Sequence, residues 1–278
     1  MLAFVYLCAV ILFLSLRIRY FAEKCTAAIF TDVQIEFFVI TILFIAYLIA
    51  KNHIQGFARF SEFMWIPLLS FIIGVLFILF PEIKISNIYP VTFYDTGNIL
   101  MATVPILAVM VYFTCMLFLG EYVDGKKDLF KYCKRYIPVC GVIAISIVFC
   151  TIGVFGYKLS QVMSQPYFSA LKNIELFTVI ERVEALAITF WLVTDIVLIV
   201  VLFYIATTLI KRIFNLPSRE KMLTPLLFLE YVLSLYIASS LFELEKYSRG
   251  IGSILYISFG IIIPFILYVI GKFRKVIS

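Results

Sequence analysis

The sequence is poor in charge and in histidine, and each shortage excludes a class of function. Charged residues make up 14% of the 278 positions and hydrophobic residues 64%, and the mean hydropathy is +1.08. A soluble domain needs more polar surface than this to cover its core, so the composition places the chain in a membrane. The only histidine, His53, falls in an expected loop, which argues against a histidine-based metal or catalytic centre.

Cysteine chemistry is also poorly represented. The six cysteines form no Cys-x-x-Cys pair and lie mostly within or beside apolar segments. We expect small packed residues with no metal or disulfide role. Because no His, Ser or Cys constellation suited to catalysis is found, an enzyme is not expected, nor is a cofactor or a metal. The net charge of +6 is assigned to cytoplasmic loops rather than to nucleic-acid binding.

Apolar stretches long enough to cross a bilayer recur along the whole chain. A hydrocarbon core of roughly 30 Å requires about 20 apolar residues in a helix. The pattern predicts an all-α polytopic membrane protein with a single membrane domain over residues 1–278. Eight spans are expected near residues 1–16, 33–50, 63–80, 99–119, 137–157, 183–210, 222–241 and 253–271.

The loops between these spans predict the orientation. With the N-terminus in the cytoplasm, 14 of the 23 Lys and Arg residues fall on the cytoplasmic side, so both termini are expected there. The outer connection 158–182 contains apolar residues at helical spacing. We predict a short surface helix at about 166–178, with a hydrophobic loop lying in the headgroups as the alternative.

Two acidic residues are expected deep within spans. Ionisable residues there are costly, so Asp195 in the sixth span and Glu230 in the seventh are candidates for ion coupling. No Lys or Arg lies deep in any expected span to neutralise them. Each acid must therefore stay protonated, hydrogen-bond to a neighbouring helix, face a water-filled cavity or hold a cation.

The sixth span begins with the charged sequence "IERVEALAITFW", residues 180–191. Thr178 and Glu181 have the spacing of a capping box, and Arg182 can reach the headgroups. The positive end of the helix dipole also stabilises the negative charges of Glu181 and Glu184. Capping and anchoring is one interpretation of this cluster, and contact with a ligand is the other.

The fourth span, "LMATVPILAVMVYFTCMLFLG", is interrupted by Pro105. Proline removes a helix hydrogen bond and frees a carbonyl. Broken helices line substrate sites in many transporters, although a tolerated kink explains the residue equally simply.

Three segments together resemble one known family. These are "QPYFSALKNIELFTVIERVEALAITFW", "HIQGFARFSEFMWIPLL" and "GKKDLFKYCKRYIP". They resemble the endospore germination receptor B-subunits, also called spore germination permeases, of the amino acid–polyamine–organocation superfamily. The resemblance implies a LeuT-like inverted-repeat transporter fold in which the eight spans correspond to family helices three to ten, so the first two have no counterpart in the chain.

The resemblance also implies a binding site and partners. The ligand pocket would lie between the fourth and sixth spans, and a helical lid would join it through Glu181, Arg182 and Glu184. Ala108 and Met110 stand where family members often carry a glycine and an acid. The ligand-binding residues implied are Thr103, Pro105, Ala108 and Thr114 on one side and Thr189, Trp191 and Asp195 on the other.

The function implied is that of a membrane-embedded B-subunit of a nutrient-germinant receptor in the spore inner membrane. It would sense a small, amino-acid-like nutrient and trigger germination together with an A-type and a lipoprotein C-type subunit. Two alternatives stay open: a proton- or cation-coupled amino-acid permease that uses Asp195 and Glu230, and an inactive truncated paralogue.

Overall fold

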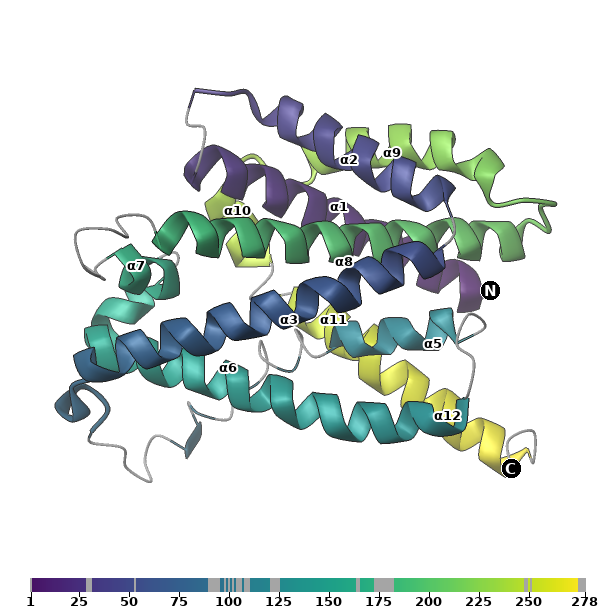
Figure 1. Cartoon of the computed structure of the whole chain (residues 1–278). Coiled ribbons are helices and arrows are strands. Elements are labelled where there is room, and N and C mark those ends of the chain that lie inside the picture. Colours follow the sequence, from purple (N-terminus) through teal and green to yellow (C-terminus); the bar gives the residue numbers. More distant parts are fainter. Residues whose placement is uncertain are drawn as a thin grey trace. The chain divides into compact units, whose positions relative to one another are not determined.

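The computed structural model describes residues 2–28, 32–52, 54–89, 96–97, 99, 101, 103, 107, 111–120, 126–163, 166–172, 183–247, 250 and 252–274. The regular structure of these residues is helical throughout (Figure 1). The chain divides into two compact units. Unit 1 comprises Met1–Phe57, Gly97–Tyr122 and Thr194–Ser278, and unit 2 comprises Ala58–Thr96 and Val123–Val193.

Unit 1 holds the N-terminal and C-terminal helices. Its elements are α1 (Leu2–Ala28), α2 (Ile35–Lys51), the short 3-10 helix η4 (Val111–Cys115), α5 (Met116–Leu119), most of α8 (Val183–Ile213), η5 (Glu220–Met222), α9 (Leu223–Tyr236), α10 (Leu241–Tyr247), α11 (Ser253–Ile257), the π-helix η7 (Ser258–Ile262) and α12 (Ile263–Phe273). Unit 2 holds most of α3 (Ile54–Leu79), η1 (Phe80–Glu82), η2 (Ile85–Asn87), α6 (Lys126–Val162), α7 (Pro166–Lys172) and the beginning of α8.

Several helices are long and apolar enough to cross a membrane. Among the described residues there are five such segments, at Leu2–Ala27, Ile54–Glu82, Phe130–Val162, Ala185–Ile213 and Ser253–Phe273. A sixth is added if α9 with η5 and α10, which meet at a bend of 101°, form one broken span. Helices satisfy their own backbone groups and can therefore tolerate lipid. The protein is an all-α polytopic membrane protein.

Helix α2 illustrates how the sequence divides between lipid and core. One face is buried at the spacing of an α-helix and includes Val39, Ile42 and Ala46, while Phe37 and Phe44 on other faces are 60% and 57% exposed. In water such exposure would be unfavourable, whereas lipid accepts it. The buried face packs against α1 and α9, which lie beside α2 within unit 1 (Figure 1).

Several helices have ends that differ from the expected spans, and α1, α6 and α9 are examples. Helix α1 continues past residue 16 to Ala28, and α6 begins at Lys126 rather than near residue 137. Both extensions carry charged residues, which hydropathy alone assigns to loops but which a helix accommodates readily. Helix α9 ends at Tyr236, and the chain turns sharply before α10.

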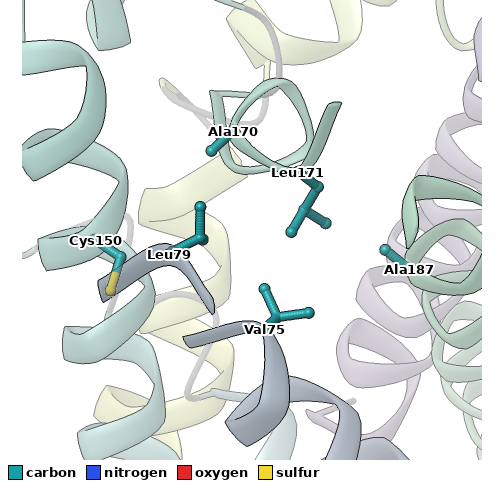
Figure 2. Close-up of a cluster of buried hydrophobic side chains, with 6 residues drawn as sticks. All are labelled: Val75, Leu79, Cys150, Ala170, Leu171 and Ala187. Carbon is teal, nitrogen blue, oxygen red and sulfur yellow. The ribbon is translucent and has the colours of Figure 1, made fainter. Parts of the chain in front are cut away.

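The core of unit 2 is a small apolar cluster. It consists of Val75 and Leu79 of α3, Cys150 of α6, Ala170 and Leu171 of α7, and Ala187 of α8. Figure 2 shows Leu79 and Leu171 pointing into the same space between their helices. Helix α7 lies within the range expected for the outer-loop helix, and residues 173–178 of that range lie outside the described residues.

Burial raises the pKa of Tyr167 on α7, which packs against this cluster, to about 12. Its phenol therefore stays neutral at physiological pH and packs as an aromatic ring.

Helix α6 is interrupted at Gly156, whose backbone has φ +76° and ψ 161°. That conformation is open almost only to glycine. Nearby carbonyls are satisfied from outside the helix, because the Asn87 side-chain amide donates to the carbonyl oxygens of Gly153 at 2.9 Å and Val154 at 3.2 Å. The backbone N–H of Lys84 also donates to Gly153, at 3.0 Å. Hydrogen bonds from other parts of unit 2 therefore stabilise the interruption of α6.

Candidate functional site

Helix α1 carries an unusual group of charged side chains beyond its apolar first half. Arg19 and Glu23, one turn apart, form an ion pair at 2.8 Å, as expected for residues at i and i+4. Arg19 also donates Nη1 to the carbonyl oxygen of Leu235 at 3.3 Å. This carbonyl lies in the last turn of α9, where helical acceptors lack internal partners. Arg19 therefore ties α1 to the end of α9.

The buried carboxylate of Asp195 lies beside two cations from the same helix. Lys24 Nζ donates to Oδ2 of Asp195 at 3.1 Å, and Nη1 of Arg17 lies 4.0 Å from Oδ1. The side chains of Lys24 and Asp195 are only 5% and 10% exposed, so water does little to screen their attraction.

This arrangement corrects the prediction that no Lys or Arg reaches the intramembrane acids. The prediction was wrong for Asp195 because the first span was taken to end at residue 16, whereas α1 continues to Ala28. Arg17 and Lys24 are seven residues apart, which is about two helical turns and therefore one face.

Tyr112 of η4 extends the group. Arg17 donates Nε to the Tyr112 hydroxyl at 2.6 Å, and the guanidinium carbon lies 4.7 Å from the centre of the Tyr112 ring. Lys24 Nζ also lies 4.5 Å from the centre of the Tyr20 ring. Aromatic faces stabilise cations in partly desolvated sites. We call Arg17, Lys24, Asp195 and Tyr112 the charge network.

Two cations of the charge network share one carboxylate. Arg19 and Glu23 neutralise each other, whereas Arg17 and Lys24 share the single carboxylate of Asp195. Arg17 lies 4.0 Å from this shared carboxylate, and its guanidinium has further donors. Such a guanidinium can also bind an anionic group, such as a ligand carboxylate.

An aromatic cavity lies next to the charge network in unit 1. It has a volume of about 40 Å³, where a water molecule needs roughly 10–15 Å³ on the same measure. Residues of α1, η4, α5, α8, α11 and η7 surround it, and Thr114 and Cys115 add polar atoms to its wall. Its six aromatic rings are those of Tyr6, Phe13, Tyr112, Phe118, Tyr256 and Phe259.

Ring contacts hold the wall of this aromatic cavity together. Phe13 stacks on Tyr256 with 4.1 Å between ring centres, and Tyr112 meets Tyr256 edge-on at 5.6 Å. Tyr112 belongs both to the cavity wall and to the charge network. An apolar chamber with a charged group behind one wall is a common design of small-molecule binding sites.

The π-helix η7 forms part of the same wall through Phe259 and Gly260. The Tyr6 hydroxyl donates to the carbonyl oxygen of Phe259 at 3.0 Å, so α1 is fastened directly to this irregular turn. Single π-turns within helices often occur at functional sites. Here the turn lies against the aromatic cavity.

Glu230 of α9 is fully buried, with 0% of its surface exposed. Ser15 Oγ lies 2.6 Å from its Oε2 atom and 3.0 Å from the carbonyl oxygen of Ile11. No hydrogen-bond partner of Oε1 is found among the described residues. Unlike Asp195, Glu230 makes no ion pair with a described Lys or Arg residue.

The residues implied as a ligand site by the family resemblance are only partly brought together. Thr114 lines the aromatic cavity, and Asp195 belongs to the charge network that shares Tyr112 with it. Thr103 is exposed, and exposed Thr189 donates its hydroxyl to the Ala185 carbonyl one turn back. Trp191 is half-buried in the unit 2 part of α8.

The remaining residues of the expected site cannot be placed. Pro105, Ala108, Glu181 and Arg182 lie outside the described residues, and of Glu184 only the backbone, in the first turn of α8, is described. Their roles in binding and gating stay predictions.

Sequence reasoning missed the cationic half of the site. The signal was available, since Arg17, Tyr20 and Lys24 recur at helical spacing in the segment "RIRYFAEK". The contribution of Tyr6, Phe13 and Tyr256 could not be found this way, because one aromatic residue in an apolar span looks like any other. No group of three or more potential metal ligands (His, Cys, Asp or Glu) is found in the described part of the chain.

These features define an integral membrane protein built of helices, with a buried charge network beside an aromatic cavity. Comparison with known proteins gives the family. A family model described as a spore germination protein, of the spore permease type, matches residues 1–242. The chain therefore belongs to the spore germination permease family and is a germination-related membrane component. The comparisons found no matching curated protein and no matching solved structure.

Proposed function

We propose that this protein is the membrane-embedded B-subunit of a spore nutrient-germinant receptor, which binds a small amino-acid-like nutrient and triggers germination. Family membership over residues 1–242 supports the germination role. The observation that carries the sensing role is the aromatic cavity beside a charge network in which Arg17 lies 4.0 Å from the carboxylate that it shares with Lys24.

The proposed ligand site uses both parts of this arrangement. An apolar side chain of the nutrient occupies the aromatic cavity, and its carboxylate approaches Arg17 near Tyr112. Arg17 suits this task because its guanidinium offers five donors, of which Nε is taken by Tyr112 and Nη1 lies at a distant 4.0 Å from Asp195. Of the residues implied by the family resemblance, Thr114 and Asp195 belong to this site, and the others stay part of the proposal.

The proposed signal is a shift between two conformations. A cavity of about 40 Å³ is smaller than an amino acid, so the nutrient selects a state with a larger chamber. A ligand shifts such an equilibrium only by its difference in affinity for the two states. Binding therefore changes the packing of α1, η4 and η7, which form part of the wall.

The proposal extends to location and partners. We place the protein in the spore inner membrane with both termini in the cytoplasm, in a complex with an A-type and a lipoprotein C-type subunit. The LeuT-like arrangement of eight helices and the gating role of Glu184 belong to the same proposal. A proton-coupled or cation-coupled amino-acid permease is the second candidate, and the burial of Glu230 is the observation that favours it.

Deletion of the gene tests the proposed function. We expect spores to lose the response to one nutrient while vegetative growth is unchanged. Normal germination with every nutrient tested would exclude the receptor role. A permease predicts instead that purified protein in proteoliposomes takes up an amino acid, so uptake without a germination phenotype would favour that candidate.

Substitution of Arg17 tests the ligand site. We expect Arg17→Gln to raise the half-maximal concentration of a carboxylate-bearing nutrient by roughly ten- to a hundredfold, because a hydrogen bond to a charged group contributes about 1.5–3 kcal/mol. Lys24 remains to neutralise Asp195 in this variant, so the protein should still fold. The control is Arg135→Gln at an exposed position of α6, with protein levels measured in both. Equal responses in the two variants would remove Arg17 from the site.

A further inference from the structure

Of the two buried acids in the described chain, Asp195 has ion-pair partners and Glu230 has none among the described residues. Its side chain is 0% exposed and its Oε1 atom has no described hydrogen-bond partner. An ionised carboxylate in so dry a place is very costly unless it is paired, and such groups become neutral instead. The contacts of the second oxygen, Oε2, indicate where the neutralising proton lies.

The hydroxyl of Ser15 has two neighbours but only one proton. It lies 3.0 Å from the carbonyl oxygen of Ile11, one turn back on α1, and 2.6 Å from Oε2 of Glu230. A carbonyl oxygen can only accept a hydrogen bond. If Ser15 donates to Ile11, then the hydrogen bond to Oε2 exists only when the carboxyl group supplies its own proton. Both contacts are satisfied together by a protonated Glu230.

Charged groups on the neighbouring elements do not replace that proton. On α1, Arg19 and Glu23 follow Ser15 on the same face, but Arg19 is engaged by Glu23 and by the Leu235 carbonyl. On α2, which packs on α9, the titratable groups are Glu36 and Lys51 at its two ends, both exposed, and the phenol of Tyr47.

The third element on α9 is η5, whose Glu220 and Lys221 are exposed, and α9 itself adds the phenols of Tyr231 and of the exposed Tyr236. None of these groups forms a described ion pair with Glu230.

We propose that Glu230 is a proton-binding site, in which the neutral carboxyl group donates its proton to Ser15 Oγ and holds α1 against α9. Loss of the proton places a bare negative charge in the contact between the two helices and weakens it. Because α1 also carries Arg17 and the Phe13 wall of the aromatic cavity, proton uptake at Glu230 is linked to the position of that wall. The site requires neither the nutrient nor a receptor partner.

Infrared spectroscopy of the full-length protein in lipid nanodiscs tests the proposal directly. A protonated carboxyl group has a carbonyl stretching band that a carboxylate lacks. We expect this band at neutral pH in the wild-type protein and its loss in Glu230→Gln. The matched control is Glu36→Gln at the exposed start of α2, in which the band should persist. Absence of any neutral-pH band that depends on Glu230 overturns the proposal.

A second variant keeps the test informative if Glu230→Gln fails to fold. Ser15→Ala removes the acceptor of the proposed hydrogen bond and should shift the same band without abolishing it. An unchanged band in Ser15→Ala contradicts the assigned geometry. Titration with Na⁺ and K⁺ adds a further outcome: if either ion raises the thermal stability of the wild type but not of Glu230→Gln, the site holds a metal cation and the proton assignment is wrong.

Discussion

The pairing of Asp195 with two cations predicts an unequal response to removal of its members. Lys24→Met leaves Asp195 with Arg17 at 4.0 Å, whereas Asp195→Asn removes the carboxylate that Lys24 and the half-buried Arg17 share. At an effective dielectric constant of about 20, the gross attraction is about 5 kcal/mol at 3.1 Å and about 4 kcal/mol at 4.0 Å. Desolvation offsets much of it, so removal of one partner typically costs about 3–5 kcal/mol.

We therefore expect Lys24→Met to lower the free energy of unfolding by about 3 kcal/mol and Asp195→Asn by about 5 kcal/mol. The double variant leaves only Arg17 and should be more stable than Asp195→Asn alone, a strongly non-additive result. The measurement is unfolding of the purified protein in mixed micelles with increasing denaturing detergent. Lys51→Met, at the exposed end of α2, is the control and should stay within about 0.5 kcal/mol of wild type.

The relative stability of Lys24→Met and Asp195→Asn tests this pairing. If Asp195→Asn is no more harmful than Lys24→Met, Asp195 is not the shared partner of Arg17 and Lys24 in the folded protein. If the double variant shows the simple sum of the two effects, the three side chains do not act as one group. Either result would refute the shared pairing from which the proposed ligand site is argued.

Two further predictions concern the backbone of α6 and the wall of the aromatic cavity. Gly156→Ala should destabilise the protein by about 1–3 kcal/mol, because alanine is strained at φ +76°. The control is Gly141→Ala, which should not destabilise the protein, because nothing lies within 4 Å of the added methyl group. Equal melting curves for the two variants would contradict the break in α6. Tyr112→Phe removes the hydroxyl that accepts a hydrogen bond from Arg17 at 2.6 Å and should weaken the nutrient response about tenfold at unchanged protein level. The control is Tyr132→Phe on the exposed surface, which should leave the response unchanged. An unaltered response in Tyr112→Phe would show that Tyr112 is not part of the site.

That this is an all-α membrane protein could be predicted largely from the apolar periodicity of its sequence. The alternation of buried and lipid-facing residues along α2 needs only the sequence and the geometry of a helix. The burial of Asp195 and Glu230, at 7% and 0% exposed, follows from their position inside apolar stretches. The family could also be predicted from the sequence, because the charged and aromatic residues of three segments resemble those of the family.

The pairing of charges was harder to predict. A window that averages hydropathy ends α1 where Arg17 appears, yet a helix continues wherever its charged residues find partners. Asp195, which accepts a hydrogen bond from Lys24, lies 171 residues away in sequence, and no local sequence pattern predicts this contact. The break at Gly156 depends in the same way on Asn87, which supplies hydrogen bonds from a different part of the chain.

The π-helix η7 also has a consequence for how this protein compares with its relatives. A π-turn accommodates one residue more than an α-helical turn, so every side chain beyond it is rotated by about 100° around the axis. The family match ends at residue 242, ahead of Ser258–Ile262. A relative one residue shorter in this segment would have a regular helix, and its side chains beyond that point would be rotated relative to those of this protein. A single-codon gap in an alignment would therefore mark the relatives in which this side of the chamber is built differently.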